Sequence, residues 1–248
     1  MSLCEQCIQG VRHEGVAEGK FEQIGGVECY VATPTVDYPK DKVILYLIDI
    51  FGIHLPNHQL LADDYARNGF KVVVPDILHG DPCPADAQAP GSNFDLKAWL
   101  AKHPGDSVKP VLEKVIGALT ESGVQNIGAL GFCYGARPAF DLAFLNVTDV
   151  TVVSHPSLLK MPEDYQRYVA ESKAPLLINS CEIDHQLHRE AQAQADEILT
   201  GFAPGYKRTY WEGCTHGFTI RGDLSNPKVK AGKEGAFKAT VEFLLKYL

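Results

Sequence analysis

The sequence has no run of about 18 apolar residues, so it predicts no helix that crosses a membrane. Its first residues, MSLCEQCIQGVRHEG, contain no apolar core of a secretory signal, and we expect a cytoplasmic protein without a membrane partner. Basic residues are outnumbered as well: 23 Lys and Arg stand against 31 Asp and Glu, for a formal net charge of −8. Because no basic stripe is available to neutralise phosphates, we expect no nucleic-acid partner.

The cysteines do not form the pattern of a disulfide framework. Their number, seven, is odd, and no secretory signal accompanies them, so we expect reduced thiols. Cys4 and Cys7 form a C-x-x-C with His13 nearby, which is compatible with half of a zinc site or with a redox pair. No second C-x-x-C follows and no strand–helix pattern surrounds the first, so we prefer free thiols as its interpretation.

Metal-ligand spacing is also lacking among the histidines. His185 and His188 form H-x-x-H, while His54 and His58 form H-x-x-x-H with Pro56 between them. Neither pair has a third ligand at a spacing that zinc sites use, so solvated side chains are the preferred interpretation. We therefore expect no metal and no cofactor.

Strand-like and helix-like segments alternate along most of the chain. We expect strands at 27–34, 42–48, 70–76, 126–132, 150–156, 174–184 and 206–213, and helices at 57–69, 107–123, 136–146, 189–201 and 231–248. This alternation predicts an α/β fold with a mostly parallel central sheet and helices on both faces. No linker, composition break or repeat divides the 248 residues, so we expect one domain over residues 1–248.

A short glycine-flanked motif follows the strand expected at 126–132. Gly131, Cys133 and Gly135 read G-x-C-x-G, where many hydrolases carry G-x-S-x-G at a sharp turn between a strand and a helix. Such a turn exposes the central side chain at the edge of the sheet, and the following helix N-terminus lowers a thiol pKa. Cys133 is thus a candidate nucleophile; a buried structural cysteine beside packing glycines is the alternative.

A thiol nucleophile needs a base, and the base needs a group that orients it. In α/β-hydrolases the chain order is nucleophile, acid, histidine. Asp184 follows the strand at 174–184 and His216 follows the strand at 206–213, so both fall at the sheet edge where α/β proteins place their sites. Glu182 is the alternative acid. His155 also ends a strand but precedes the acid, so we expect it to line the pocket or cap a neighbouring element.

Backbone N–H groups are expected to bind the oxyanion that forms during acyl transfer. One donor should be the residue after the nucleophile, here Tyr134. The other should come from the loop that follows an earlier strand, and Ile50 in LIDIFGIHLPN has this position. Gly52 allows that loop to turn.

Four sequence blocks together resemble one known family. DIFG after the early strand, GFCYGA at the turn, EIDH and THGF occur in this order and look like the dienelactone hydrolases, also called carboxymethylenebutenolidases. The resemblance extends from about Gly25 to the C-terminus, and the early segments look most like the eukaryotic members. It implies an α/β-hydrolase in which Cys133 is the nucleophile, His216 the base and acid, and Asp184 its orienting group, with an oxyanion hole at Ile50 and Tyr134.

The chain departs from the bacterial members at three positions. Their DIFG-like block begins with a glutamate that bonds to the resting thiol and helps to generate the thiolate; Asp49 stands there, one methylene shorter. They hold a substrate carboxylate with two arginines. Gly80 occupies the place of one, and Arg221 lies one position away from the place of the other. The chemistry therefore transfers from the resemblance, whereas the substrate remains open.

Residues 79–105 form a long excursion rich in Pro, Gly and Ala, with a short helix expected at about 94–103. Excursions of this length are often lids or pocket walls. Trp99, Phe94 and Tyr134 are candidates to line an apolar pocket, and packing within the core or lid is the alternative for Trp99 and Phe94.

These features predict a monomer or homodimer that hydrolyses a small-molecule ester or lactone through a thioester on cysteine. A thiol nucleophile suits good leaving groups, such as those of enol lactones and activated esters. A binding protein of the same fold without catalysis, or a thiol redox sensor, is the alternative function.

Overall fold

The computed structural model describes residues 9–87, 89 and 91–248. Its eight strands form one sheet in the order β1-β2-β4-β3-β5-β6-β7-β8. β2 runs antiparallel to β1 and to β4, and all other neighbours are parallel. The strands are β1 Lys20–Ile24, β2 Val27–Ala32, β3 Lys42–Leu47, β4 Val72–Pro75, β5 Asn126–Phe132, β6 Val150–Ser154, β7 Leu176–Ile183 and β8 Tyr206–Thr215.

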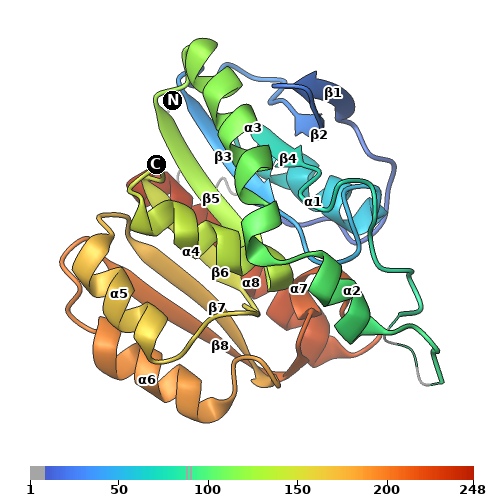
Figure 1. Ribbon diagram of the computed structural model, residues 1–248, viewed down its shortest axis with the longest axis vertical. Coiled ribbons are helices and arrows are strands. Elements are labelled where there is room, and N and C mark those ends of the chain that lie inside the picture. The colour runs from blue at the N-terminus through green and yellow to red at the C-terminus, as the bar shows by residue number, and fades with distance from the viewer. Residues whose placement is uncertain (1–8, 88, 90) are drawn as a thin grey trace.

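Helices cover both faces of this sheet (Figure 1). They are α1 Pro56–Arg67, α2 Leu96–Lys102, α3 Lys109–Glu121, α4 Ala136–Phe144, α5 Glu163–Glu171, α6 Arg189–Leu199, α7 Phe218–Arg221 and α8 Pro227–Tyr247. In Figure 1, α3, α4, α5 and α6 lie on the near face and α8 lies behind the sheet. The Tyr65 ring of α1 packs against Phe237 of α8 at 4.9 Å between centroids, so these two helices share the far face.

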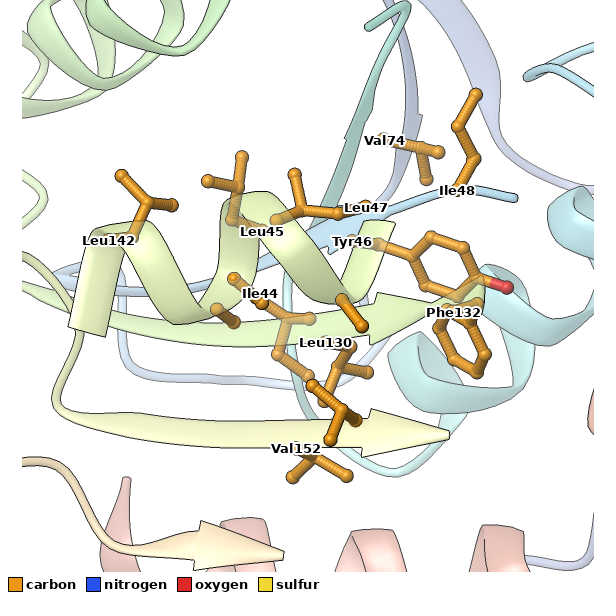
Figure 2. Packing of buried hydrophobic residues seen from close by; sticks show 14 of the residues in the cluster. Ile44, Leu45, Tyr46, Leu47, Ile48, Val74, Leu130, Phe132, Leu142 and Val152 are labelled. Atoms are coloured by element: carbon orange, nitrogen blue, oxygen red, sulfur yellow. The ribbon is translucent and has the colours of Figure 1, made fainter. Parts of the chain in front are cut away.

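The core is centred on β3 and β5, where side chains are buried on both faces. Val43 to Leu47 are each at most 1% exposed, as the unbroken apolar run predicts for a central parallel strand. Tyr46 stacks on Phe132 of β5 with centroids 4.5 Å apart (Figure 2). Burial of these side chains fixes the carboxyl ends of the two strands beside each other.

The predicted α/β-hydrolase architecture, a mostly parallel sheet with helices on both faces, is confirmed. All seven expected strands and all five expected helices form, and the short helix expected at 94–103 is α2. Three elements were not predicted: β1, which pairs with β2 across the Gly25–Gly26 turn, and helices α5 and α7. The last helix begins at Pro227, four residues before the expected start, because Asn226 caps it.

No helix in the described part of the chain is long and apolar enough to span a membrane. Cys4 and Cys7 lie outside the described residues, and their neighbour His13 pairs with Glu234 at 2.8 Å. Among the described residues there is also no group of three His, Cys, Asp or Glu side chains that could hold a metal ion.

Candidate active site

The glycine-flanked motif forms a strained turn between β5 and α4. Cys133 has φ of +49°, a left-handed conformation that costs energy for any residue with a Cβ. The flanking glycines allow the close approach that the turn requires. A Cβ on Gly131 would lie 2.6 Å from the carbonyl oxygen of Gly135, and a Cβ on Gly135 would overlap the carbonyl oxygen of Leu47. Only glycine fits at positions 131 and 135 of this backbone. The turn that they form presents Cys133 at the carboxyl edge of the sheet.

Asp184 and His216 meet at the same edge because β7 and β8 are parallel neighbours. Ile183 pairs with Thr215, so the next residue of each strand emerges side by side. His216 Nδ1 lies 2.9 Å from both carboxylate oxygens of Asp184. Asp184 also accepts hydrogen bonds from the backbone N–H groups of Gln186 and Leu187, which fix its orientation.

The electrostatics of the pair favour a charged imidazole facing a carboxylate. Burial alone lowers the pKa of His216, but the hydrogen bonds and charges of Asp184 and Cys133 outweigh it and raise that pKa to about 10. Burial would likewise raise the pKa of Asp184, and the bonds from His216 and the backbone N–H groups lower it instead. Glu182, the alternative acid, accepts a hydrogen bond from the Gly213 N–H and so faces away from this pair.

Ser157 lies between Cys133 and His216, and the sequence reasoning did not find it. Its Oγ is 3.3 Å from Cys133 Sγ and 3.4 Å from His216 Nε2, and its backbone N–H donates to the Cys133 carbonyl at 3.0 Å. The signal was available: Ser157 comes three residues after β6, whose carboxyl end lies beside that of β5. A polar residue just after a central parallel strand is a candidate for the site, and Ser157 has this position.

The two expected oxyanion donors lie beside the thiol. β3 pairs in register with β5, Leu47 opposite Gly131, so the loop after β3 passes next to the turn. Ile50 and Tyr134 are both buried and both line the same cavity as Cys133. The Ile50 carbonyl accepts a hydrogen bond from the Cys83 N–H at 2.8 Å, which orients this peptide segment.

That cavity has a volume of about 400 Å³ and collects side chains from the loops at the carboxyl edge of the sheet and from helix α2 of the excursion. It is lined by Ile50, Leu96, Leu100, Cys133, Tyr134, Ser157, Leu158, His185, Gln186 and His216. Its size is within the range of small-molecule sites, and the candidate nucleophile and base open into it together. The two histidines of the H-x-x-H pair separate: His185 lies at this cavity, whereas His188 Nδ1 caps helix α6.

The Asp49 carboxylate bonds to groups other than the Cys133 thiol. Its carboxylate is fully buried and accepts from the Phe51 N–H at 2.9 Å, faces His58 Nε2 at 2.8 Å and pairs with Arg221 Nε at 3.1 Å. Burial alone would raise its pKa, but His58, Arg221 and the Phe51 N–H hold the pKa well below the usual range of a carboxyl group. In the described structure no hydrogen bond joins Asp49 to Cys133, so its action on the thiol stays a prediction.

Arg221 and His155, the candidates for contacts with the substrate, are not among the side chains that line the cavity, and a role of either in substrate binding stays a prediction. Arg221 is held by Asp49 and lies over the Phe51 ring at 4.2 Å. His155 is fully buried; its Nε2 bonds to Thr219 Oγ1 at 2.7 Å. Burial and the charge of His216 keep the pKa of His155 well below its ordinary value, so it packs behind the site as a neutral ring.

Trp99 does not line the cavity either, because its ring faces the excursion itself. Its Nε1 donates to the Asp81 carbonyl at 2.9 Å, and the ring stacks on His103 at 4.0 Å between centroids. The same helix turns Leu96 and Leu100 toward the cavity instead. The lid-packing alternative is therefore correct for Trp99, and Phe94 likewise packs against the core.

An eight-stranded sheet with a strained turn after β5, and with an acid and a histidine at the ends of β7 and β8, defines the class of the protein as an α/β-hydrolase fold. The model of the dienelactone hydrolase family matches residues 27–248, and the chain belongs to this family.

Curated relatives match over almost the whole chain. Hydrolase pyvD of Aspergillus violaceofuscus is 32% identical over 247 residues, covering 98% of this chain and 96% of the relative. Dienlactone hydrolase 1 of Gibberella moniliformis is 32% identical over 248 residues, covering 98% and 92%. Among solved structures, a putative dienelactone hydrolase from Klebsiella pneumoniae matches with a TM-score of 0.70 at 18% identity, covering 89% of this chain and 93% of its own, which supports the fold. The chain is thus a hydrolase of the dienelactone hydrolase type.

Proposed function

We propose that the chain hydrolyses a lactone or an activated carboxylic ester through a thioester on Cys133. The observation that carries the proposal is the His216–Asp184 pair, 2.9 Å apart, opening into one cavity with a thiol on a strained turn. A nucleophile, a base and a group that orients the base are the parts that covalent acyl transfer needs.

The chemistry follows from the hydrogen bonds of His216. Its Nδ1–H donates to Asp184, so Nε2 takes the thiol proton, and the raised pKa of His216 favours the thiolate–imidazolium pair that results. The Cys133 thiolate then attacks the carbonyl carbon, and the N–H groups of Ile50 and Tyr134 stabilise the oxyanion. Collapse of the adduct breaks the C–O bond, and the leaving alkoxide takes the proton from Nε2.

Water completes the cycle at the same place. Nε2 accepts a proton from water as the oxygen attacks the thioester carbonyl, and the second adduct collapses to a carboxylic acid and the Cys133 thiolate. The imidazolium that remains returns its proton to the sulfur. Each turnover therefore consumes one ester and one water and leaves His216 and Cys133 unchanged.

Trapping the intermediate tests the proposal. After brief mixing with p-nitrophenyl acetate, intact-mass spectrometry should find one added acetyl group on Cys133, and Cys133→Ala should lose both the adduct and turnover. Cys29→Ala is the matched control, since Cys29 is another buried thiol on β2. If the acetyl group lands elsewhere and Cys133→Ala keeps its activity, the nucleophile is wrong.

The pH dependence of thiol alkylation separates hydrolysis from the non-catalytic alternative. A thiolate prepared by His216 reacts with iodoacetamide well below pH 8, and His216→Ala should slow this reaction. An alkylation profile that His216→Ala leaves unchanged, together with absent turnover, would favour a binding protein or a redox sensor.

A further inference from the structure

We propose that this site takes a neutral ester or lactone with an apolar acyl group and discriminates against an acyl group that carries a carboxylate. The inference rests on the proposed function and adds the substrate class to it. It is carried by the composition of the cavity lining.

Most of the apolar side chains that line the cavity are aliphatic. Leu96 and Leu100 approach from helix α2, Leu158 from the loop after β6, and Ile50 from the loop after β3. Of the polar residues that line it, Cys133, Ser157 and His216 are assigned to the chemistry, the Tyr134 hydroxyl donates to the His103 carbonyl, and His185 and Gln186 are exposed to water. An acyl chain that extends past the thiol therefore gains about 0.8 kcal/mol for each methylene that the leucines remove from water.

No arginine or lysine lines the cavity in the described structure, and the residues outside the described ranges include neither. Arg221 is engaged by Asp49, and turning it toward the cavity would strand a fully buried carboxylate. His185, at the cavity, is exposed to water, so it gives a carboxylate no desolvated partner. A substrate carboxylate would thus lose its hydration among leucines with no arginine or lysine to pair with it, and the one imidazolium there, His216, is already paired with Asp184; this loss of hydration is costly.

Two aryl esters of equal length test this selectivity. p-Nitrophenyl hexanoate and p-nitrophenyl hydrogen adipate share a six-carbon acyl chain and differ in the terminal methyl or carboxylate. The kcat/KM of the purified protein should be about 100-fold higher for the hexanoate, as expected when a hydrophobic pocket must desolvate a charge. Equal or faster hydrolysis of the adipate would overturn the proposal.

A gain of charge provides the matched variants. Leu158→Arg places a guanidinium at the cavity on a side chain that is already 38% exposed, so folding should tolerate it. It should lower the hexanoate-to-adipate ratio by at least about tenfold, as a bidentate partner for the carboxylate. Leu145→Arg, with the same change at a 64% exposed position away from the cavity, should leave the ratio unchanged. Equal effects of both variants would contradict the assigned acyl site.

A reaction that needs no hydrolysis distinguishes the two proposals. Hexyl and carboxypentyl methanethiosulfonate both transfer a thioalkyl group to a thiolate and release methanesulfinate. Relative to free glutathione, the hexyl reagent should modify Cys133 faster. If neither ester turns over but the hexyl preference holds, the hydrolase proposal fails and the apolar site stands. Faster modification by the carboxypentyl reagent would refute the apolar site whatever the hydrolysis result.

The distances around Ser157 carry a second, independent inference. We propose that Ser157 is a further catalytic residue, whose hydroxyl contacts the Cys133 thiol and relays its proton to His216. Its Oγ is within 3.3 Å of the sulfur and 3.4 Å of Nε2, and its backbone N–H fixes the Cys133 carbonyl. The thiol gives its proton to the hydroxyl as the hydroxyl gives its own to Nε2, which yields thiolate and imidazolium and leaves serine intact.

Removal of the hydroxyl tests this relay. Ser157→Ala should shift the pH midpoint of Cys133 alkylation upward by about one unit and lower kcat about tenfold with KM unchanged, as expected for loss of one hydrogen bond to the ionised thiol. Ser157→Thr keeps a hydroxyl and should restore the midpoint. Ser154→Ala, which removes a buried hydroxyl bonded to Asn179, should not shift it. An unchanged midpoint in folded Ser157→Ala would refute the relay.

Discussion

Replacing Arg221 by methionine should destabilise the fold strongly, because it strands a buried carboxylate. Asp49 is fully buried, and its Oδ2 lies 3.1 Å from Arg221 Nε. Breaking a buried ion pair by removing one partner costs about 3–5 kcal/mol. The Arg221 side chain is 24% exposed, and Asp49 keeps His58 and the Phe51 N–H, so we expect the lower part of that range, about 3 kcal/mol.

Urea unfolding at pH 7 measures this cost from the midpoint and slope of the transition. Asp49→Asn combined with Arg221→Met removes both charges, so the double variant should be at least about 1 kcal/mol more stable than the sum of the single effects predicts. Arg189→Met is the control: it makes the same chemical change on the exposed face of α6 and should alter stability by less than about 0.5 kcal/mol.

Acid unfolding of Arg221→Met tests the sign of the contribution that Asp49 makes to stability. The lowered pKa of Asp49 stabilises the fold above the unfolded carboxyl value of about 3.9, and this contribution disappears as the pH falls toward the folded pKa. Without Arg221 the folded pKa rises, so the contribution should be smaller and should disappear at a higher pH. A cost below about 1 kcal/mol for Arg221→Met, or strictly additive single effects, would refute the stranded-charge argument.

Three further predictions concern the turn and the triad. Gly135→Ala should cost more than about 2 kcal/mol in thermal unfolding, because its methyl group overlaps the Leu47 carbonyl, whereas Gly117→Ala, with open space in α3, should not destabilise. Asp184→Asn should lower kcat/KM for an activated aryl ester by about 10³-fold by misorienting the His216 ring. The raised pKa of His216 stabilises the fold fully below about pH 6.5 and loses this effect toward pH 10, a decline that calorimetry should find absent in His216→Ala.

Local sequence patterns predicted the central sheet well, because long apolar runs such as those of the core strands fit few other places in a fold. The run at 42–48 is apolar without interruption, and only a central strand buried on both faces accommodates it. Cys133, Asp184 and His216 were selected because parallel strands bring their carboxyl ends to one edge. The structure places all three there, while their catalytic roles stay predictions.

The missed elements have weak or conflicting local signals. β1 is half-exposed at the edge of the sheet and gains its definition from pairing with β2, which no local pattern reports. The sequence could not decide where Arg221 and Trp99 point. The family resemblance left Arg221 near the site and packing in the lid was an open alternative for Trp99, but the direction of a side chain depends on its tertiary partner, here Asp49 for one and the Asp81 carbonyl for the other.

The excursion between β4 and α3 carries part of the cavity lining on a different segment from the strand ends that carry Cys133, Asp184 and His216. The candidate reacting side chains sit on strand ends whose register the whole sheet enforces. Leu96 and Leu100 instead sit on α2, in a segment joined to the rest of the fold by bonds such as those from the Cys83 N–H to the Ile50 carbonyl and from the Tyr134 hydroxyl to the His103 carbonyl. Under the proposed function, substitutions in this segment that keep these bonds should alter the acyl pocket without disturbing the reaction centre. Selection can thus retune what such an enzyme accepts while it conserves how the enzyme works.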